Sequence, residues 1–213
     1  MKKLKIYLGC MLVGLASGVF LTACDKQPIA VTGVMLDKTK VEITIGETML
    51  LKATVTPNDA ANQDVKWTSS NQNIATVDTN GKVTAINVGT AAIIVTTDDG
   101  GKTANCEVTV NPIYVTGVIL DKNDAEIPIG ESEILKATVS PSNATYQDIQ
   151  WISSNQDIAT VDKNGKVTAL AIGTATITVT TDDGGKTANC IVTVTGVSGQ
   201  RNDYGDDNKK NWD

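Results

Sequence analysis

The sequence predicts an all-β protein that consists of two tandem β-sandwiches of one kind. Residues 67–110 return almost unchanged as residues 151–194, and self-similarity at a fixed spacing indicates two copies of one structural unit. Each copy consists of short runs in which apolar and polar residues alternate, separated by turn residues, as is typical of a sandwich or barrel. Neither copy contains an amphipathic helix of useful length. These three features together define the fold class.

The complete repeat is longer than this segment and spans residues 31–110 and 115–194, so that equivalent positions differ by 84. About 56 of the 80 aligned pairs are identical. A domain of this size buries a modest core that is sufficient for independent folding. We therefore predict a first domain at residues 30–111 and a second at residues 112–196.

Residues 1–23 form a targeting segment. Three lysines lie within the first five residues, and the apolar stretch at residues 8–20 is too short to span a bilayer comfortably. The segment ends in Leu-Thr-Ala-Cys, which resembles the lipobox of a bacterial lipoprotein signal peptide. That resemblance implies cleavage before Cys24, a diacylglycerol on its thiol and a further acyl chain such as palmitate on its amine. The alternative is an ordinary signal peptide that happens to contain Cys24.

Residues 24–29 follow as a short tether, in which Pro28 interrupts regular structure. In the first copy, runs of alternating residues then predict eight strands, and Asn80-Gly81 and Gly100-Gly101 supply the positive φ angles that tight hairpins require. The predicted strands are Thr32–Asp37, Lys40–Ile45, Met49–Thr56, Asp64–Ser69, Ile74–Asp78, Lys82–Ile86, Ala91–Thr97 and Thr103–Val110.

Comparison of the two copies assigns the faces of these strands. Ile93 corresponds to Ile177 and is apolar in both copies, whereas Ile94 corresponds to Thr178, so the face that carries Ile94 tolerates hydroxyl groups. Glu107 corresponds to Ile191 and marks the exposed side of the last strand. The alternation predicts the following buried positions: Leu51, Ala53, Val55, Val65, Trp67, Ala91, Ile93, Val95, Ala104, Cys106, Val108 and Val110.

Three stretches of each copy carry a family resemblance. The order W-x-S-S-N-x-x-I-A-T-V-D-x-N-G-K-V-T-A, then G-T-A-x-I-x-V-T, then C-x-V-T-V, resembles the bacterial immunoglobulin-like (Ig-like) domain, group 2. The resemblance covers residues 30–111 and 113–196. It implies a Greek-key β-sandwich found in tandem on bacterial and phage surface proteins, often in adhesins, and it brings no catalytic residues. The alternating strands favour the same sandwich independently.

The charge balance excludes some partners. The chain has 18 basic and 24 acidic residues, and loss of the signal peptide with its three lysines leaves a net charge of −9. Nucleic acid requires a basic surface, so we expect no nucleic-acid partner. No polybasic patch is available for anionic lipid, so the membrane contact depends on the lipid on Cys24. Residues 197–213 are polar and without periodicity, and we predict a disordered tail there.

The side chains that could carry chemistry are few. The chain contains no histidine, the commonest general base near neutral pH. Each copy has one cysteine, Cys106 or Cys190, which the alternation places on the buried side of the last strand. One cysteine in each sandwich cannot form an antibody-like disulfide, so we expect free, buried thiols. We therefore expect a protein that is not an enzyme and that needs no cofactor.

Two other features allow alternative interpretations. Trp67 and Trp151 occupy the core position of the third strand of an Ig-like domain, although exposed aromatic rings could instead stack on sugars. The acidic turns could bind calcium through Asp98, Asp99, Asp182 and Asp183. Because calcium requires six to eight oxygen ligands and an EF-hand spacing is absent, solvated hairpin turns are the better interpretation.

These features predict a lipid-anchored, monomeric protein of the cell envelope that binds a protein ligand, as an adhesin does, through loops and strand edges. The alternatives are a glycan-binding accessory protein and a structural spacer on the cell surface. We expect the outer membrane or the cell surface rather than the inner membrane, although Asp25 after the lipidated cysteine leaves the choice open. The sequence does not identify the ligand.

Overall fold

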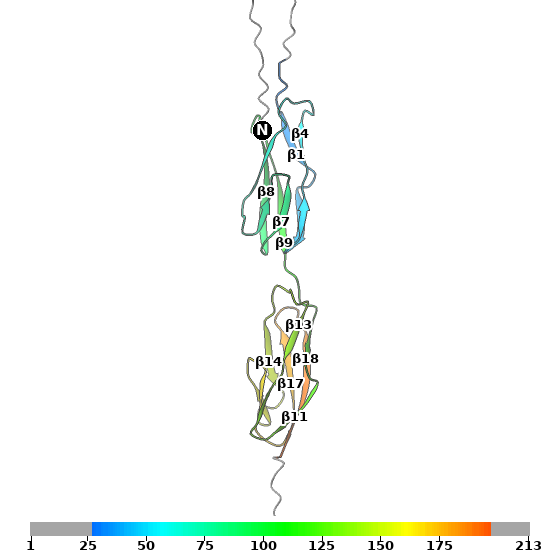
Figure 1. The fold of residues 1–213 in the computed structure, drawn as a ribbon, viewed down its shortest axis with the longest axis vertical. Coiled ribbons are helices and arrows are strands. Elements are labelled where there is room, and N and C mark those ends of the chain that lie inside the picture. Colours follow the sequence, from blue (N-terminus) through cyan, green and yellow to red (C-terminus); the bar gives the residue numbers. More distant parts are fainter. Residues whose placement is uncertain (1–26, 197–213) are drawn as a thin grey trace, which may run out of the picture. The chain divides into compact units, whose positions relative to one another are not determined.

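The computed structural model describes residues 27–196, and within them all helical or strand structure is β-strand (Figure 1). The signal segment, Cys24, and the tail at residues 197–213 lie outside the described residues. No helix in the described part of the chain is long and apolar enough to cross a membrane. The prediction of an all-β fold is confirmed.

Each copy contains nine strands, and each is considered by itself. In the first copy the strands are β1 (Gly33–Leu36), β2 (Lys40–Thr44), β3 (Thr48–Leu50), β4 (Ala53–Thr56), β5 (Val65–Ser69), β6 (Ala75–Val77), β7 (Lys82–Ala85), β8 (Gly89–Thr97) and β9 (Thr103–Asn111). In the second they are β10 (Gly117–Leu120), β11 (Asp124–Pro128), β12 (Ser132–Ile134), β13 (Ala137–Ser140), β14 (Ile149–Ser153), β15 (Ala159–Val161), β16 (Lys166–Ala169), β17 (Gly173–Thr181) and β18 (Thr187–Thr195).

The strands of both copies pair in the same order. One sheet has four strands, in the order β2-β9-β8-β5 or β11-β18-β17-β14. The opposite layer consists of a three-stranded sheet, β3-β7-β6 or β12-β16-β15, and a two-stranded sheet, β1-β4 or β10-β13. The chain therefore changes sheet after β5 and returns at β8, and does the same after β14 and at β17. This connectivity is that of a Greek-key sandwich.

The single strand predicted at Met49–Thr56 is wrong. The chain forms two strands there: β3 pairs with β7, and β4 pairs with β1. Between them, the N–H of Lys52 donates to the carboxylate of Asp37 at 2.8 Å, while Leu51 is 1% exposed and its N–H donates to the carbonyl of Gly81 at 3.0 Å. Because a side chain takes the place of a ladder partner, the pairing changes here, and alternation alone does not reveal such a change.

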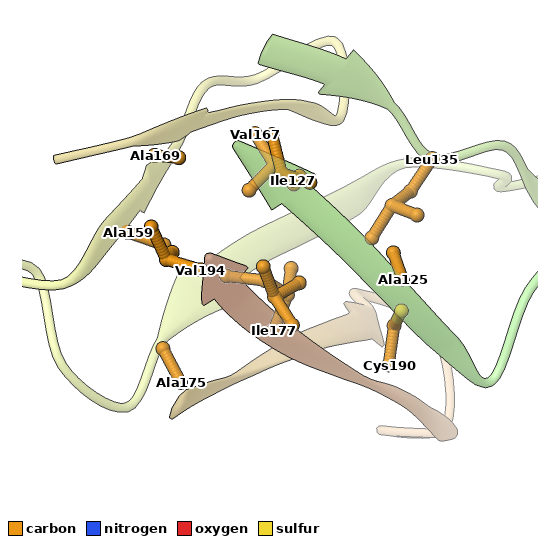
Figure 2. Packing of buried hydrophobic residues seen from close by; sticks show 11 residues of the cluster. Ala125, Ile127, Leu135, Ala159, Val167, Ala169, Ala175, Ile177, Cys190 and Val194 are labelled. Carbon is orange, nitrogen blue, oxygen red and sulfur yellow. The ribbon is translucent and has the colours of Figure 1, made fainter. Parts of the chain in front are cut away.

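The core lies between the two layers and is built mainly from small and β-branched residues. Figure 2 shows the cluster in the second copy, where side chains from both layers meet. Its members are Ala125, Ile127, Leu135, Ala159, Val167, Ala169, Ala175, Ile177, Cys190, Val192 and Val194. The predicted burial of Ile93 and of Ile177 is confirmed, since both are fully buried.

Four of the predicted buried residues in the first copy are only half-buried: Ala53, Val65, Trp67 and Ala104. All four pack against the buried cluster that contains Val95. Val65 and Trp67 belong to β5, which is the last strand of its sheet, so one flank of each side chain has no neighbouring strand to cover it. The prediction was correct about their direction and wrong about the extent of their burial.

Candidate functional site

The acidic turn between β8 and β9, which contains Asp98 and Asp99, is hydrogen-bonded to the first residues of its domain. The carboxylate of Asp99 accepts a hydrogen bond from the N–H of Val31 at 3.0 Å, across 68 residues of sequence. In the second domain Asp183 accepts the equivalent bond from the N–H of Val115 at 2.7 Å. These two carboxylates therefore have a structural role in their hairpins.

The first aspartate of each turn also has a partner. Asp98 forms an ion pair with Lys66 at 2.8 Å, and this bond raises the pKa of the lysine. Asp182 accepts a hydrogen bond from the side-chain amide of Gln150 at 2.7 Å. Within residues 27–196, no three Cys, Asp or Glu side chains are grouped as metal ligands. The four calcium candidates thus act as hydrogen-bond acceptors within their own domains.

The two cysteines lie in the core as free thiols, as predicted. Burial is the main cause that raises the pKa of Cys106 and that of Cys190 above the ordinary value. A nucleophilic cysteine needs the opposite shift and an accessible thiol. Both residues are therefore suited to packing rather than to chemistry.

The two tryptophans lie on edge strands and are half-buried. The six-membered ring of Trp151 packs against Gly165, where an added Cβ would lie 2.9 Å from Cζ2. The equivalent distance from Gly81 to Cζ2 of Trp67 is 2.8 Å. Both glycines have positive φ angles, of 83° and 79°, in the turn before the following strand. The tryptophans thus mark the core as predicted, but part of each indole reaches the surface.

In the second domain Trp151 separates two grooves. The smaller has a volume of about 240 Å³ and lies between β14 and β15; it is lined by Trp151, Ile152, Ser153, Gln156, Thr160 and Val161. The larger, of about 420 Å³, lies beside the beginning of β14 and is lined by Ile134, Leu135, Lys136, Ala137, Thr138, Ile149, Trp151, Lys163 and Asn164. The exposed part of the indole therefore faces space that a ligand can enter.

β14 has one edge that no other strand in the described residues covers, because β17 is its only neighbour. The N–H of Ser154 donates to the carbonyl of Thr176, and the N–H of Asp182 donates to the carbonyl of Asp148, each at 2.9 Å. Because antiparallel pairs alternate, the even-numbered residues of β14 bond to β17 and the odd-numbered residues direct their N–H and C=O groups outward. The outward groups belong to Ile149, Trp151 and Ser153.

The same geometry holds for β5 in the first domain. The N–H of Ser70 donates to the carbonyl of Ala92, and the N–H of Asp98 donates to the carbonyl of Asp64, each at 2.9 Å. β8 is the only strand that pairs with β5 within residues 27–196. The outward groups here belong to Val65, Trp67 and Ser69. Sequence alone predicted that strand edges would bind, but it did not identify these two strands, because alternation does not reveal which strand lies at an edge.

Two β-sandwiches of this connectivity are Ig-like domains. The chain belongs to the family of bacterial Ig-like domains, group 2, whose model matches residues 30–108 and 114–192.

Relatives share this repeat over much of the chain. An uncharacterized protein of Clostridium acetobutylicum is 34% identical over 207 residues, which cover 94% of this chain but 21% of that protein. An Ig-like virion protein of Serratia phage KSP90 is 37% identical over 174 residues, covering 80% of this chain and 67% of the relative. Among solved structures, the S-layer protein rSbsC has 23% identity and a TM-score of 0.40, over 78% of this chain and 28% of that one.

Proposed function

We propose that this protein is a lipid-anchored, non-catalytic binding protein of the bacterial cell surface, whose Ig-like domains make protein–protein contacts of the kind that adhesion requires. The observation that carries the proposal is the open strand edge of β14 in the second domain, beside the half-buried Trp151. An unpaired edge offers N–H and C=O groups to another chain, and natural proteins usually protect such edges.

Other observations support the same function. The lipobox-like segment before Cys24 supports a lipid anchor. The relative from Serratia phage KSP90 is an Ig-like virion protein, so related domains occur in a protein of the virus particle. A non-catalytic role is consistent with a chain that lacks histidine and whose domain cysteines are buried. The outer membrane or the cell surface is the proposed location.

Protease or antibody access to the two domains on intact cells, with lysed cells as control, tests the location. We expect both domains to be reached on whole cells. If the domains are reached only after lysis, the proposal of surface adhesion is wrong and a periplasmic scaffold takes its place. Cys24→Ala tests the anchor: we expect the variant to leave the membrane fraction, and retention there would contradict lipidation at this residue.

A glycan-binding accessory function is the second candidate, and the larger groove at Trp151 favours it. Lys136 and Lys163 line that groove, and neither ammonium group has an ion-pair partner among the described residues. An aromatic ring beside two cations suits a carboxylated sugar. Quenching of tryptophan fluorescence by tetragalacturonate, with neutral maltotetraose as control, tests it. Equal responses to both sugars, or no response to either, would reject this candidate.

A further inference from the structure

The outward groups of β14 define the shape of a ligand. Along five residues, the edge presents N–H and C=O groups from alternate positions in one line, and only an extended backbone can pair with all of them. Successive side chains of a strand added here would point alternately to the inner and the outer face of the sheet. A strand added here would become the fifth strand of the sheet formed by β11, β18, β17 and β14.

The smaller groove beside this edge can take inward side chains of an added strand. Its volume of about 240 Å³ lies between Trp151 on β14 and Thr160 and Val161 on β15. Inward side chains of an added strand would enter this space. Because β15 forms the far wall, the edge of a second complete sandwich would meet that wall, whereas a lone extended segment would not.

The first domain protects the equivalent edge with charge. Lys66 lies on the outer face of β5, where its side chain is 76% exposed and pairs with Asp98. Lysine on an edge strand is a common device against unwanted strand pairing. The second domain has Gln150 at this position, and Ile152, which is 60% exposed, in place of Thr68. The outer face of β14 therefore has no charged residue of its own: it presents the apolar Ile152 and the amide of Gln150, which donates to Asp182.

Some of the differences between the two copies lie on this same outer face. Every residue that is buried in the first domain has an identical counterpart 84 positions later. The outer face of the four-stranded sheet differs at these pairs: Lys40 and Asp124, Thr44 and Pro128, Lys66 and Gln150, Thr68 and Ile152, Ala92 and Thr176, Ile94 and Thr178, Glu107 and Ile191, and Asn111 and Thr195. The two domains thus share most of their core, apart from Val41 and its counterpart Ala125, and differ on this outer face.

We propose that the open edge of β14 is the site at which an extended, uncharged segment of a partner protein is added to the second domain as a fifth strand. The segment has β-branched side chains at alternate positions, because Ile152 and the groove at Trp151 offer an apolar contact on either face. β5 does not accept the segment, because Lys66 and Thr68 replace the apolar outer face. This inference rests on the proposed protein-binding function and names its site and its partner.

The test uses residues 25–213 and a synthetic peptide with the sequence of residues 174–180, flanked by two lysines at each end for solubility. This segment belongs to β17, and its residues 177–180 already pair antiparallel with β14 on the other edge. With saturating peptide, we expect about tenfold slower hydrogen exchange at the amides of Ile149, Trp151 and Ser153. The amides of Val65, Trp67 and Ser69 should be unaffected. A peptide with proline at alternate positions is the control, because proline cannot donate to a ladder.

Exchanging residues between the copies sharpens the test. Ile152→Lys should abolish the protection without changing the circular dichroism spectrum, and Ile152→Thr should weaken binding roughly fivefold. The double variant Lys66→Gln with Thr68→Ile should bring protection to the amides of β5. Protection that is equal in both wild-type domains, or absent from β14, would overturn the proposal.

Two further results are informative. Protection of β14 that rises with protein concentration in the absence of peptide would show that a second copy of the chain is the occupant, which also overturns the proposal. Because these measurements use purified protein, they do not depend on where the domains are displayed. Domains that are hidden on intact cells would overturn surface adhesion and leave strand addition standing.

Discussion

In the first domain the outer face of the four-stranded sheet carries two ion pairs, Lys66 with Asp98 and Lys40 with Glu107, at 2.8 Å and 3.1 Å. In the second domain the positions of Lys66 and Glu107 hold Gln150 and Ile191. The second domain has Asp124 and Glu126 on β11, so its outer face is less charged around β14 and β18 rather than uncharged. The ion pair at Lys66 resists the approach of another strand at β5, and its absence at β14 permits it.

The outer face and the core of a sandwich are subject to different physical demands. A close-packed interior does not accept a change of one methylene without cost, and the buried residues of the first domain all recur in the second. An exposed face can change charge and polarity at little cost to stability. Differences on that face can therefore reflect what each domain meets in solution, because the core changes little: its main substitution is Ala125 for Val41.

The largest expected effect tests the equality of the two cores. Ile93→Ala and Ile177→Ala each remove a fully buried side chain, and each should lower the free energy of unfolding of its own domain by about 3 kcal/mol. Urea titration followed by hydrogen exchange of peptides from each domain measures both losses. A difference between them of more than about 1 kcal/mol would show that the two cores are not energetically equivalent.

The next effect concerns the glycines beneath the tryptophans. Gly81→Ala and Gly165→Ala introduce a Cβ at a positive φ, 2.5 Å and 2.4 Å from the carbonyl oxygens of Leu51 and Leu135 and next to an indole ring, and each should cost roughly 2 kcal/mol of domain stability. Gly46→Ala and Gly130→Ala are matched controls, because both have a φ of 85° but no atom within 4 Å of the added Cβ. Thermal unfolding of all four variants separates the cost of the positive φ from the cost of the close contacts of the added Cβ. If the controls lose as much stability as the test variants, those contacts contribute nothing.

A smaller effect depends on pH and should again be equal in the two domains. Backbone hydrogen bonds from Lys82 and Asn80 lower the pKa of Asp78, and those from Lys166 and Asn164 lower the pKa of Asp162. Because the folded pKa lies below the ordinary value of 3.8, the stability that each carboxylate contributes is present above that pH. It is lost as the pH falls through the folded value.

The variants Asp78→Asn and Asp162→Asn keep an acceptor oxygen but cannot ionise. We expect each to reduce the slope of domain stability against pH below about pH 4, with little change of slope between pH 5 and pH 7. Urea unfolding at a series of pH values measures the slope. An unchanged slope below pH 4 would show that other groups dominate acid unfolding.

The sequence predicted the repeat, the sandwich and most inward-facing residues, because alternation and turn residues are local signals. It did not predict the break between β3 and β4, which depends on a bond from Lys52 to Asp37, 15 residues away. It placed Trp67 and Trp151 in the core, but could not show that their strands lie at an edge. Edge positions depend on the order of strands in space, and this order is a property of the whole fold.

The same limit applies to the candidate site. The outward groups at Ile149, Trp151 and Ser153 follow from the register of β14 on β17, which no local pattern contains. The contrast between Lys66 and Gln150 is visible in the sequence. It acquires a meaning only once both residues are known to lie on edge strands.

The smallest expected effect on stability tests whether the charge on the edge serves folding or binding. Lys66→Gln should leave the urea midpoint of the first domain almost unchanged, because the ion pair with Asp98 is largely exposed and is screened by water and salt. Gln150→Lys should likewise leave the second domain's midpoint almost unchanged, since Asp182 can accept the new ammonium group as it accepts the amide. Any difference should vanish in about 1 M salt. A large loss on removing Lys66 would assign the ion pair a structural role, and the contrast between the two edges would then reflect folding. An unchanged midpoint, together with altered peptide binding, means that the charge protects the edge from other strands.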